Sequence, residues 1–307
     1  MNKQKRRTRS ALFILAFIVI MAIIMLLALS MLSASKSSIA TSDEIRFVKV
    51  DDIQIAYKEF GTGEPVILIM GFSGTMDLWD TEFLKELSSH YKVIIFDNRG
   101  MGNSASSAKN FSIELFADDT TEFMDALGID HAHVIGWSLG TYISQELVLR
   151  HPEKVDKLVL YAGDCGGTET IMPTNEILTK LTDESGTAEE RNLRMLDLLF
   201  PKKWLEEHPD PTEYFPNVTE TSLPESINRQ NQAWLDWEGT CSRLSKITQP
   251  TLLITGTEDV LTPPQNSEIM ARLIPNSQLK MVTGGGHGLM YQDLGFAESV
   301  VEFLENS

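Results

Sequence analysis

Ser138 is the residue of this sequence best placed to do covalent chemistry. It stands between two glycines in the pattern Gly136-Trp137-Ser138-Leu139-Gly140, which ends an apolar run of strand length and is followed by a helix-compatible stretch. Such a strand-to-helix turn holds the serine in a strained conformation with its hydroxyl exposed, and the glycines remove side chains that would block the crossing. Gly-x-Ser-x-Gly also occurs in ordinary turns, so the assignment of Ser138 as a nucleophile depends on its partners.

A serine hydroxyl is a weak nucleophile and needs a base within hydrogen-bonding reach. Among the six histidines of the chain, His287 is the candidate, because it lies in a glycine-rich loop, 283–288, directly after a predicted strand, 278–282. The other five lie in polar or proline-flanked settings, or at the start of the strand that leads to Ser138: His90, His131, His133, His151 and His208.

The acid that orients the base is expected in another loop at the same edge of the sheet. Asp259 follows the predicted strand 251–255 and precedes a helix-compatible stretch. The chain order Ser, Asp, His is also the order of the nucleophile-elbow architecture. Asp164, which follows the predicted strand 157–162, is the reserve candidate. We expect the neighbouring Glu258 to point elsewhere.

The negative charge that develops on a substrate carbonyl oxygen needs fixed N–H donors, and the loss of one such donor costs about 3 to 4 kcal/mol of barrier. The expected donors are the backbone N–H of Leu139, directly after the nucleophile, and that of Phe72, in the loop after the predicted strand 66–70. Met70 and Trp137 are expected to line the pocket. These four side chains are apolar, so the sequence predicts a substrate with a hydrophobic acyl or alcohol group.

These residues need a scaffold in which strands alternate with helices. Continuous apolar runs predict buried strands, and stretches with helical periodicity, such as 78–89 and 111–127, separate them. We therefore expect an α/β fold whose mostly parallel sheet carries helices on both faces, formed by residues 45–164 and 245–307. The stretch 165–244 contains six prolines between short helical pieces, which predicts a helical insertion. Most of its large aromatic side chains should form a small core of its own, with one or two lining a pocket: Trp204, Tyr214, Trp234 and Trp237.

Together these features resemble the α/β-hydrolase superfamily, in its cap-bearing branch of small-molecule esterases. The resemblance spans residues 45–306 and includes the segment Asp97-Asn98-Arg99-Gly100-Met101-Gly102-Asn103-Ser104. It implies a doubly wound, mostly parallel sheet of about eight strands, a triad of Ser138, His287 and Asp259, and a cap, 165–244, over the active site. The segment that begins at Asp97 is a structural turn in similar proteins, so Asp97 and Arg99 receive no catalytic role. Many relatives have a histidine where this chain has Met70, which leaves the shape of the oxyanion loop and of the substrate pocket less defined.

The first 44 residues differ in composition from the rest. Five cationic residues within 1–10 precede an apolar run, 11–32, of 22 residues without a charge. As a helix this run would be about 33 Å long, enough to cross a hydrocarbon core of about 30 Å. We expect a transmembrane signal anchor with a cytoplasmic tail, a linker at 33–44 and an extracytoplasmic catalytic domain. The alternative is a signal peptide that is cleaved among the small residues after the run, which would release a secreted enzyme.

Charge and cysteine content restrict the partners. Without residues 1–40 the chain keeps 20 basic and 43 acidic residues, a net charge of −23, which repels nucleic acid. Metal-binding spacings of cysteine and histidine are absent from the sequence, so we expect neither a metal nor an organic cofactor. The two cysteines, Cys165 and Cys241, allow one disulfide in an oxidising compartment, but two buried thiols fit equally well.

The sequence thus predicts a membrane-anchored serine hydrolase that cleaves a small carboxylic ester or a related acyl compound through an acyl-enzyme. Three alternatives stay open. An aminopeptidase that releases N-terminal proline would need acidic side chains to hold a free amine, for which the insertion offers Glu206, Glu207, Asp236 and Glu238. A cofactor-free acyltransferase or perhydrolase would use the same triad with another acceptor. A non-catalytic binding protein on the same fold would leave the triad unused.

Overall fold

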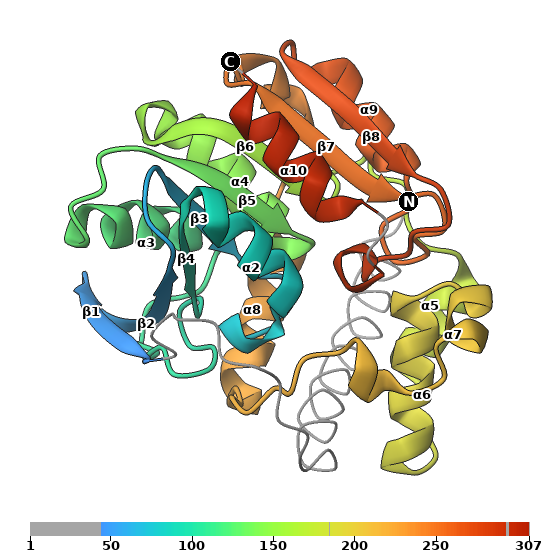
Figure 1. Ribbon diagram of the computed structural model, residues 1–307. Coiled ribbons are helices and arrows are strands. Elements are labelled where there is room, and N and C mark those ends of the chain that lie inside the picture. Colours follow the sequence, from blue (N-terminus) through green and yellow to red (C-terminus); the bar gives the residue numbers. More distant parts are fainter. Residues whose placement is uncertain (1–43, 184, 293–294, 307) are drawn as a thin grey trace, which may run out of the picture.

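One eight-stranded sheet forms the centre of the molecule (Figure 1). The computed structural model describes residues 44–183, 185–292 and 295–306. The strands lie in the order β1-β2-β4-β3-β5-β6-β7-β8; β2 pairs antiparallel with β1 and β4, and the remaining pairs are parallel. The expected, mostly parallel sheet of about eight strands is confirmed. The strands are β1 (Arg46–Val50), β2 (Ile53–Phe60), β3 (Pro65–Ile69), β4 (Lys92–Phe96), β5 (Ala132–Trp137), β6 (Val155–Tyr161), β7 (Thr251–Gly256) and β8 (Ser277–Val282).

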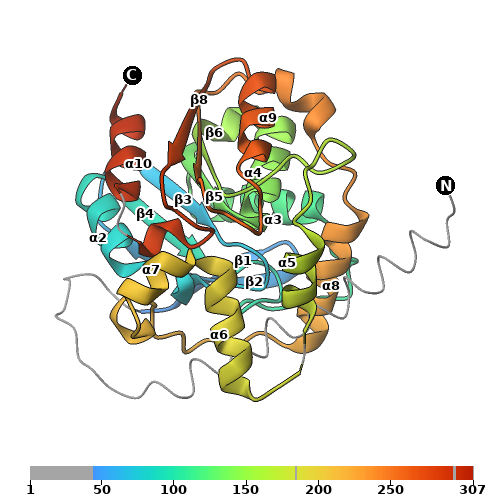
Figure 2. The ribbon, with the colours of Figure 1, turned by 90° about the vertical axis from the view of Figure 1, so that its right-hand side faces the viewer.

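Helices cover both faces of this sheet (Figure 2). α3 (Ile113–Ala126), α4 (Leu139–Arg150) and α9 (Gln265–Leu273) pack on one face, and α2 (Thr81–His90) and α10 (Phe296–Glu305) pack on the other. Every residue of the central strands β5 and β7 is buried as a result. Burial on both faces explains why these strands carry mostly apolar side chains on both faces rather than alternating apolar and polar ones.

Between β6 and β7 the described residues form helices instead of strands. They are α5 (Asn175–Thr182), α6 (Ala188–Leu199), α7 (Lys202–Glu207) and α8 (Pro224–Asp236). In Figure 1, α5, α6 and α7 lie together at the lower right, apart from α8. The boundaries of a core and a cap, as drawn from the sequence, stay a prediction.

A disulfide joins the two ends of this helical region. Cys165 and Cys241 are bonded, with their Cα atoms 5.0 Å apart, and the Thr240 N–H donates to the Cys165 carbonyl oxygen over 2.7 Å. The question that the sequence left open is thereby answered in favour of one disulfide. The described residues also contain five short 3-10 helices: η1 (Met76–Leu78), η2 (Pro152–Lys154), η3 (Pro211–Glu213), η4 (Cys241–Lys246) and η5 (Leu289–Tyr291).

The expected architecture needs one correction, which concerns the transmembrane helix in front of the core. In the part of the chain that the structure describes, no helix is both long and apolar enough to cross a membrane. The longest of these helices, α3, has 14 residues, which corresponds to about 21 Å, less than the hydrocarbon thickness of about 30 Å. The structure therefore supports the eight-stranded sheet with its helices, without a transmembrane helix among the described residues. The predicted tail, anchor and linker, 1–10, 11–32 and 33–44, lie outside the described residues except for Glu44.

Candidate active site

Ser138 occupies a strained turn between β5 and α4. Its φ of 55° and ψ of −120° lie outside the regions that a residue with a side chain prefers, a conformation that costs about 1–3 kcal/mol and is typical of functional sites. The two glycines allow the turn to be this tight: a Cβ on Gly136 would lie 2.4 Å from the Gly140 carbonyl oxygen, and a Cβ on Gly140 would lie 2.0 Å from that of Ile69. Ser138 is partly exposed, whereas its neighbours Trp137 and Leu139 are buried.

His287 and Asp259 are in contact at the carboxyl end of the sheet. His287 Nδ1 lies 2.9 Å from Asp259 Oδ2, and both residues are buried. The N–H groups of Leu261 and Thr262 both donate to Asp259 Oδ1 over 2.9 Å, and the Thr262 hydroxyl donates to Oδ2 over 2.7 Å. A carboxylate fixed in this way favours the tautomer that carries the proton on Nδ1, which leaves Nε2 available as a base.

The backbone of His287 is fixed by two aromatic side chains. Trp137 Nε1 donates to the His287 carbonyl oxygen over 3.2 Å, and the Tyr161 hydroxyl donates to the same oxygen over 2.6 Å. The rings of Trp137 and Tyr161 stack at a centroid distance of 5.8 Å. Trp137, which the sequence placed at the pocket, therefore also packs below the histidine loop. The contribution of Tyr161 was not foreseen from the sequence, because its contact joins residues 126 positions apart. Thr262 was not foreseen either, although it lies only three residues after Asp259 and its contact is local.

Asp164, the reserve candidate for the acid, has other partners. Its carboxylate accepts hydrogen bonds from the Tyr142 hydroxyl (2.8 Å), the Gly166 N–H (2.8 Å) and the Thr170 hydroxyl (3.1 Å). Burial raises the pKa of Asp164 above its usual range, although the Tyr142 hydroxyl opposes this shift. Glu258, the neighbour of Asp259, is exposed. The structure thus brings His287 to Asp259 rather than to either of the other two acids.

The loop after β3 lies against the turn that contains Ser138. A Cβ on Gly71 would lie 3.2 Å from the Cβ of Ser138, so the absence of a side chain allows this close approach. Phe72, Ser138 and Leu139 line the same cavity. Leu139 is the first residue of α4, a position whose N–H has no acceptor within its own helix. The assignment of the Phe72 and Leu139 N–H groups as the oxyanion hole stays a prediction.

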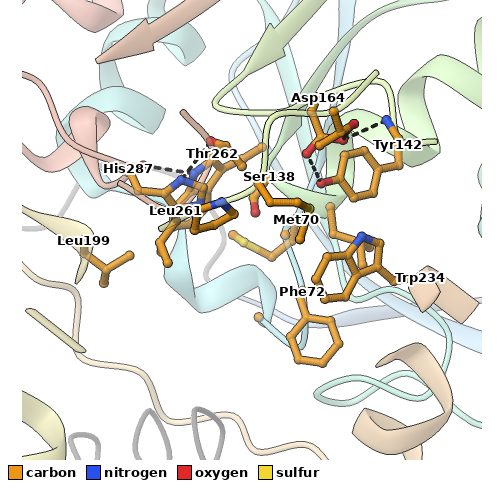
Figure 3. A pocket seen from close by; sticks show the side chains of 18 of the residues that line it. Met70, Phe72, Ser138, Tyr142, Asp164, Leu199, Trp234, Leu261, Thr262 and His287 are labelled. Atoms are coloured by element: carbon orange, nitrogen blue, oxygen red, sulfur yellow. Dashed lines mark hydrogen bonds between the residues drawn. The ribbon is translucent and has the colours of Figure 1, made fainter. Parts of the chain in front are cut away.

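The cavity beside Ser138 has a volume of about 340 Å³ and apolar walls (Figure 3). Met70 and Trp137, which the sequence placed at the pocket, both line it together with His287. Within the described residues, the structure contains no hydrogen bond between Ser138 and His287; catalytic hydrogen bonds often tighten only when substrate is bound. The helical region contributes further apolar side chains to the wall: Leu178, Met195, Leu199, Phe215, Trp234, Leu235 and Trp237.

The four large aromatics of the helical region divide into two groups. Trp234 and Trp237 line the cavity. Trp204 and Tyr214 pack instead around Phe200, at centroid distances of 4.9 and 5.2 Å. The acidic residues that could have held the amine of an aminopeptidase substrate are all exposed, and none of them lines the cavity: Glu206, Glu207, Asp236 and Glu238.

The turn after β4 is built around a buried carboxylate, as the resemblance implied for a structural segment. Asp97 Oδ1 accepts from the Met76 N–H and Oδ2 accepts from the Asn103 N–H, both over 2.8 Å. Glu220, from the segment between α7 and α8, lies beside it. Burial raises the pKa of Asp97 to about 6, and burial together with the nearby Asp97 charge raises the pKa of Glu220 to about 9. Among the described residues, no cluster of histidine, cysteine, aspartate and glutamate is placed to hold a metal ion.

Comparison with known proteins defines the class to which this fold and site belong. Residues 64–294 match the family described as alpha/beta hydrolase fold, and the chain therefore belongs to this family and is a hydrolase. It is 29% identical over 245 residues to a putative carbamate hydrolase, RutD, of Azorhizobium caulinodans, covering 77% of this chain and 89% of that protein.

Two further relatives agree with this placement. The chain is 30% identical to a putative non-heme bromoperoxidase, BpoC, of Mycobacterium tuberculosis, covering 80% of this chain and 93% of that protein. The solved structure of Est816, described as an N-acyl homoserine lactone degrading enzyme, superposes with a TM-score of 0.69 at 25% identity, covering 84% of this chain and 100% of that one.

Proposed function

We propose that the protein is a serine hydrolase that cleaves a small carboxylic ester through an acyl-enzyme. The observation that carries the proposal is the contact of 2.9 Å between His287 Nδ1 and Asp259 Oδ2, in a cavity that Ser138 and His287 both line. A buried acid, an oriented imidazole and a strained serine turn are the parts that nucleophilic acyl transfer requires.

In the proposed mechanism His287 Nε2 takes the hydroxyl proton while Ser138 Oγ attacks the ester carbonyl carbon. The Leu139 and Phe72 N–H groups stabilise the resulting oxyanion. The carbonyl re-forms as the bond to the alcohol oxygen breaks, and His287 returns its proton to that oxygen. Water, deprotonated by His287, then attacks the acyl-enzyme, which releases the carboxylic acid and restores the Ser138 hydroxyl.

The substrate is proposed to be small and partly apolar. The cavity of about 340 Å³ lies at the lower end of the range for ligand pockets, about 300–1,000 Å³. Its walls match a hydrocarbon chain rather than a sugar or a nucleotide. The names of Est816 and RutD, a lactone-degrading enzyme and a putative carbamate hydrolase, support a bond between a carbonyl carbon and an oxygen or nitrogen as the one that is cleaved.

A fluorophosphonate probe tests the nucleophile, because it reacts only with an activated serine. We expect the purified protein to be labelled, Ser138→Ala to lose the label, and the matched control Ser89→Ala, an exposed serine on α2, to keep it. A series of p-nitrophenyl esters of rising chain length then measures the acyl pocket. Labelling that persists in Ser138→Ala would contradict the assignment, and an unlabelled wild-type protein would favour a binding function on the same fold.

A second candidate function is acyl transfer to hydrogen peroxide, which the name of the relative BpoC, a putative non-heme bromoperoxidase, supports. Peroxide would replace water as the acceptor of the acyl group, and the product would be a peracid. The measurement is peracid formation from an ester and hydrogen peroxide. A rate no greater in wild type than in Ser138→Ala would exclude this activity.

For the site of action, we propose an oxidising compartment outside the cytoplasm. The pairing of Cys165 with Cys241 supports this proposal, because disulfides persist in such compartments and are rare in the cytosol. Rapid alkylation of thiols in intact cells, followed by mass spectrometry, tests it. Alkylation of both cysteines without prior reduction would contradict the proposal.

A further inference from the structure

Asp164 places a buried carboxylate in the wall of a mainly apolar cavity. The residue is 7% exposed and lines the cavity together with Tyr142 and Thr170. Its hydrogen bonds come from neutral donors, the Tyr142 and Thr170 hydroxyls and the Gly166 N–H. No described lysine, arginine or histidine forms an ion pair with it. Because a carboxylate is costly to remove from water without a counter-charge, its position in the cavity wall indicates a ligand.

The hydrogen bonds of Asp164 leave room for one more donor. A carboxylate offers about four lone-pair positions on its two oxygens. Oδ1 accepts from Gly166 and Thr170, whereas Oδ2 accepts from the Tyr142 hydroxyl alone. The Tyr142 ring is held in place by stacking on Trp237 at a centroid distance of 4.7 Å. The acceptor in the cavity wall is therefore rigid, as a specific subsite requires.

The position of Asp164 relative to Ser138 indicates which part of a substrate would reach it. In Figure 3, His287 lies on one side of Ser138, and Asp164 lies with Tyr142 on the other. The leaving-group oxygen must lie on the side of His287, because His287 protonates it. The acyl substituent then extends to the opposite side, which is the side of Asp164 and Tyr142.

We propose that Asp164, positioned by Tyr142, is a specificity residue that binds a hydrogen-bond donor on the acyl part of the substrate. This inference rests on the proposed ester hydrolysis at Ser138 and deepens it. The donor is a hydroxyl or a protonated amino group, so the preferred substrates are hydroxyacyl or aminoacyl esters. One hydrogen bond to a charged group corresponds to a factor of at least about ten in kcat/KM.

The test compares matched methyl esters of hexanoic acid, unsubstituted or carrying a hydroxyl or amino group at carbon 2, 3 or 6. Donors at carbons 4 and 5 are omitted because they close into five- and six-membered rings. Methanol release gives kcat/KM for every ester with one assay. We expect at least one substituted ester to be preferred over methyl hexanoate by about tenfold or more; a preference for hydroxyl or for amino compounds identifies the donor.

Variants assign the preference to Asp164. Asp164→Asn, which keeps the shape but removes the charge, should lower the ratio of substituted to unsubstituted kcat/KM by about tenfold for an amino donor and less for a hydroxyl. The matched control Asp236→Asn, an exposed carboxylate at the end of α8, should leave the ratio as in wild type. A ratio unchanged in Asp164→Asn would overturn the proposal.

The ester series measured with wild-type protein tests the acyl subsite even if Asp164→Asn does not fold. Hydrolysis of methyl hexanoate with no preference for any substituted ester overturns this inference and leaves the proposed ester hydrolysis standing. Absence of hydrolysis of every ester, together with absence of fluorophosphonate labelling, overturns both.

Discussion

Asp259 is held by more partners than any other carboxylate near Ser138. It accepts from the N–H groups of Leu261 and Thr262, from the Thr262 hydroxyl and from His287. These contacts remove its rotational freedom and leave the imidazole a single orientation and a single tautomer. In the proposed mechanism, the rate of proton transfer from Ser138 to His287 therefore depends on the identity of this one side chain.

Replacing Asp259 by asparagine tests this role. The Asn side chain keeps the shape but presents an amide, which favours the wrong tautomer of His287, and we expect kcat to fall by about 10⁴-fold with little change in KM. Steady-state kinetics with p-nitrophenyl butyrate measure the effect, and Glu258→Gln, a change at the exposed neighbour, is the matched control. A loss of less than tenfold would show that another group orients the imidazole.

The residues with proposed catalytic roles could be predicted because each follows a strand at the same edge of the sheet. Ser138, Asp259 and His287 come after β5, β7 and β8, and parallel strands bring such positions together. Tyr161 could not be predicted in the same way. The Tyr161 hydroxyl reaches the carbonyl oxygen of a residue 126 positions away, and a sequence without its tertiary structure contains no signal for such a contact.

At the scale of elements, a helix from the inserted region supports the loop after β3, which is the proposed oxyanion loop. Ser73, next to Phe72, has a φ of 50°, a left-handed conformation that costs about 1–3 kcal/mol in a residue with a side chain. Its N–H donates to Gln230 Oε1 on α8 over 2.5 Å. Gln230 is fully buried, so its amide is available to hold the loop rather than to contact solvent.

Gln230→Met should weaken catalysis without loss of substrate affinity. The methionine has a similar volume but no acceptor, so the loop loses a hydrogen bond worth about 1 kcal/mol, and we expect kcat to fall about five- to tenfold with KM nearly unchanged. The control is Gln232→Met, at an exposed position on the same helix. A change in KM with no change in kcat would show that α8 acts on substrate binding and not on the oxyanion loop.

The contact between Asp97 and Glu220 should make the stability of the folded protein dependent on pH. Burial holds the pKa of Glu220 at about 9 in the folded protein, against an ordinary value of 4.5. The folded state therefore keeps a proton that the unfolded state has released at intermediate pH. The contribution of protonated Glu220 to the free energy of unfolding is fully present below about pH 4.5. It decreases as the pH rises towards 9, by at most about 1.4 kcal/mol per pH unit.

Urea unfolding at pH 6 and pH 8 measures this slope. We expect wild type to be less stable at pH 8 than at pH 6, and Glu220→Gln, which cannot ionise, to show a smaller difference. Glu225→Gln, an exposed glutamate in the first turn of α8, should behave as wild type. Equal slopes in wild type and Glu220→Gln would mean that Glu220 is not protonated in the folded state.

For the molecule as a whole, the sheet was predictable and the arrangement of the inserted region was not. β3 and β4 contain continuous apolar runs because helices cover both faces of the sheet, and that pattern is visible in the sequence. Prolines separate α6, α7 and α8, and the inserted region contacts the core through scattered side chains such as Gln230 on α8 and Glu220 in the segment before it. Their positions follow from tertiary contacts and from the disulfide, neither of which has a periodic signature.

The disulfide should contribute more to the stability of the whole molecule than any single contact discussed above. Cys165 and Cys241 are 76 residues apart in the sequence, and a cross-link that closes a loop of this length restricts the unfolded chain by about 4 kcal/mol. We expect the double variant Cys165→Ala, Cys241→Ala to lose about this much free energy of unfolding in urea, and wild type under a reducing agent to lose a similar amount. The reducing agent should leave the double variant unaffected. Gly166 and Gly167, which follow Cys165, line the cavity. We therefore expect KM to rise both in the double variant and in wild type under the reducing agent. Lowered stability with an unchanged KM would show that the disulfide has a structural role alone.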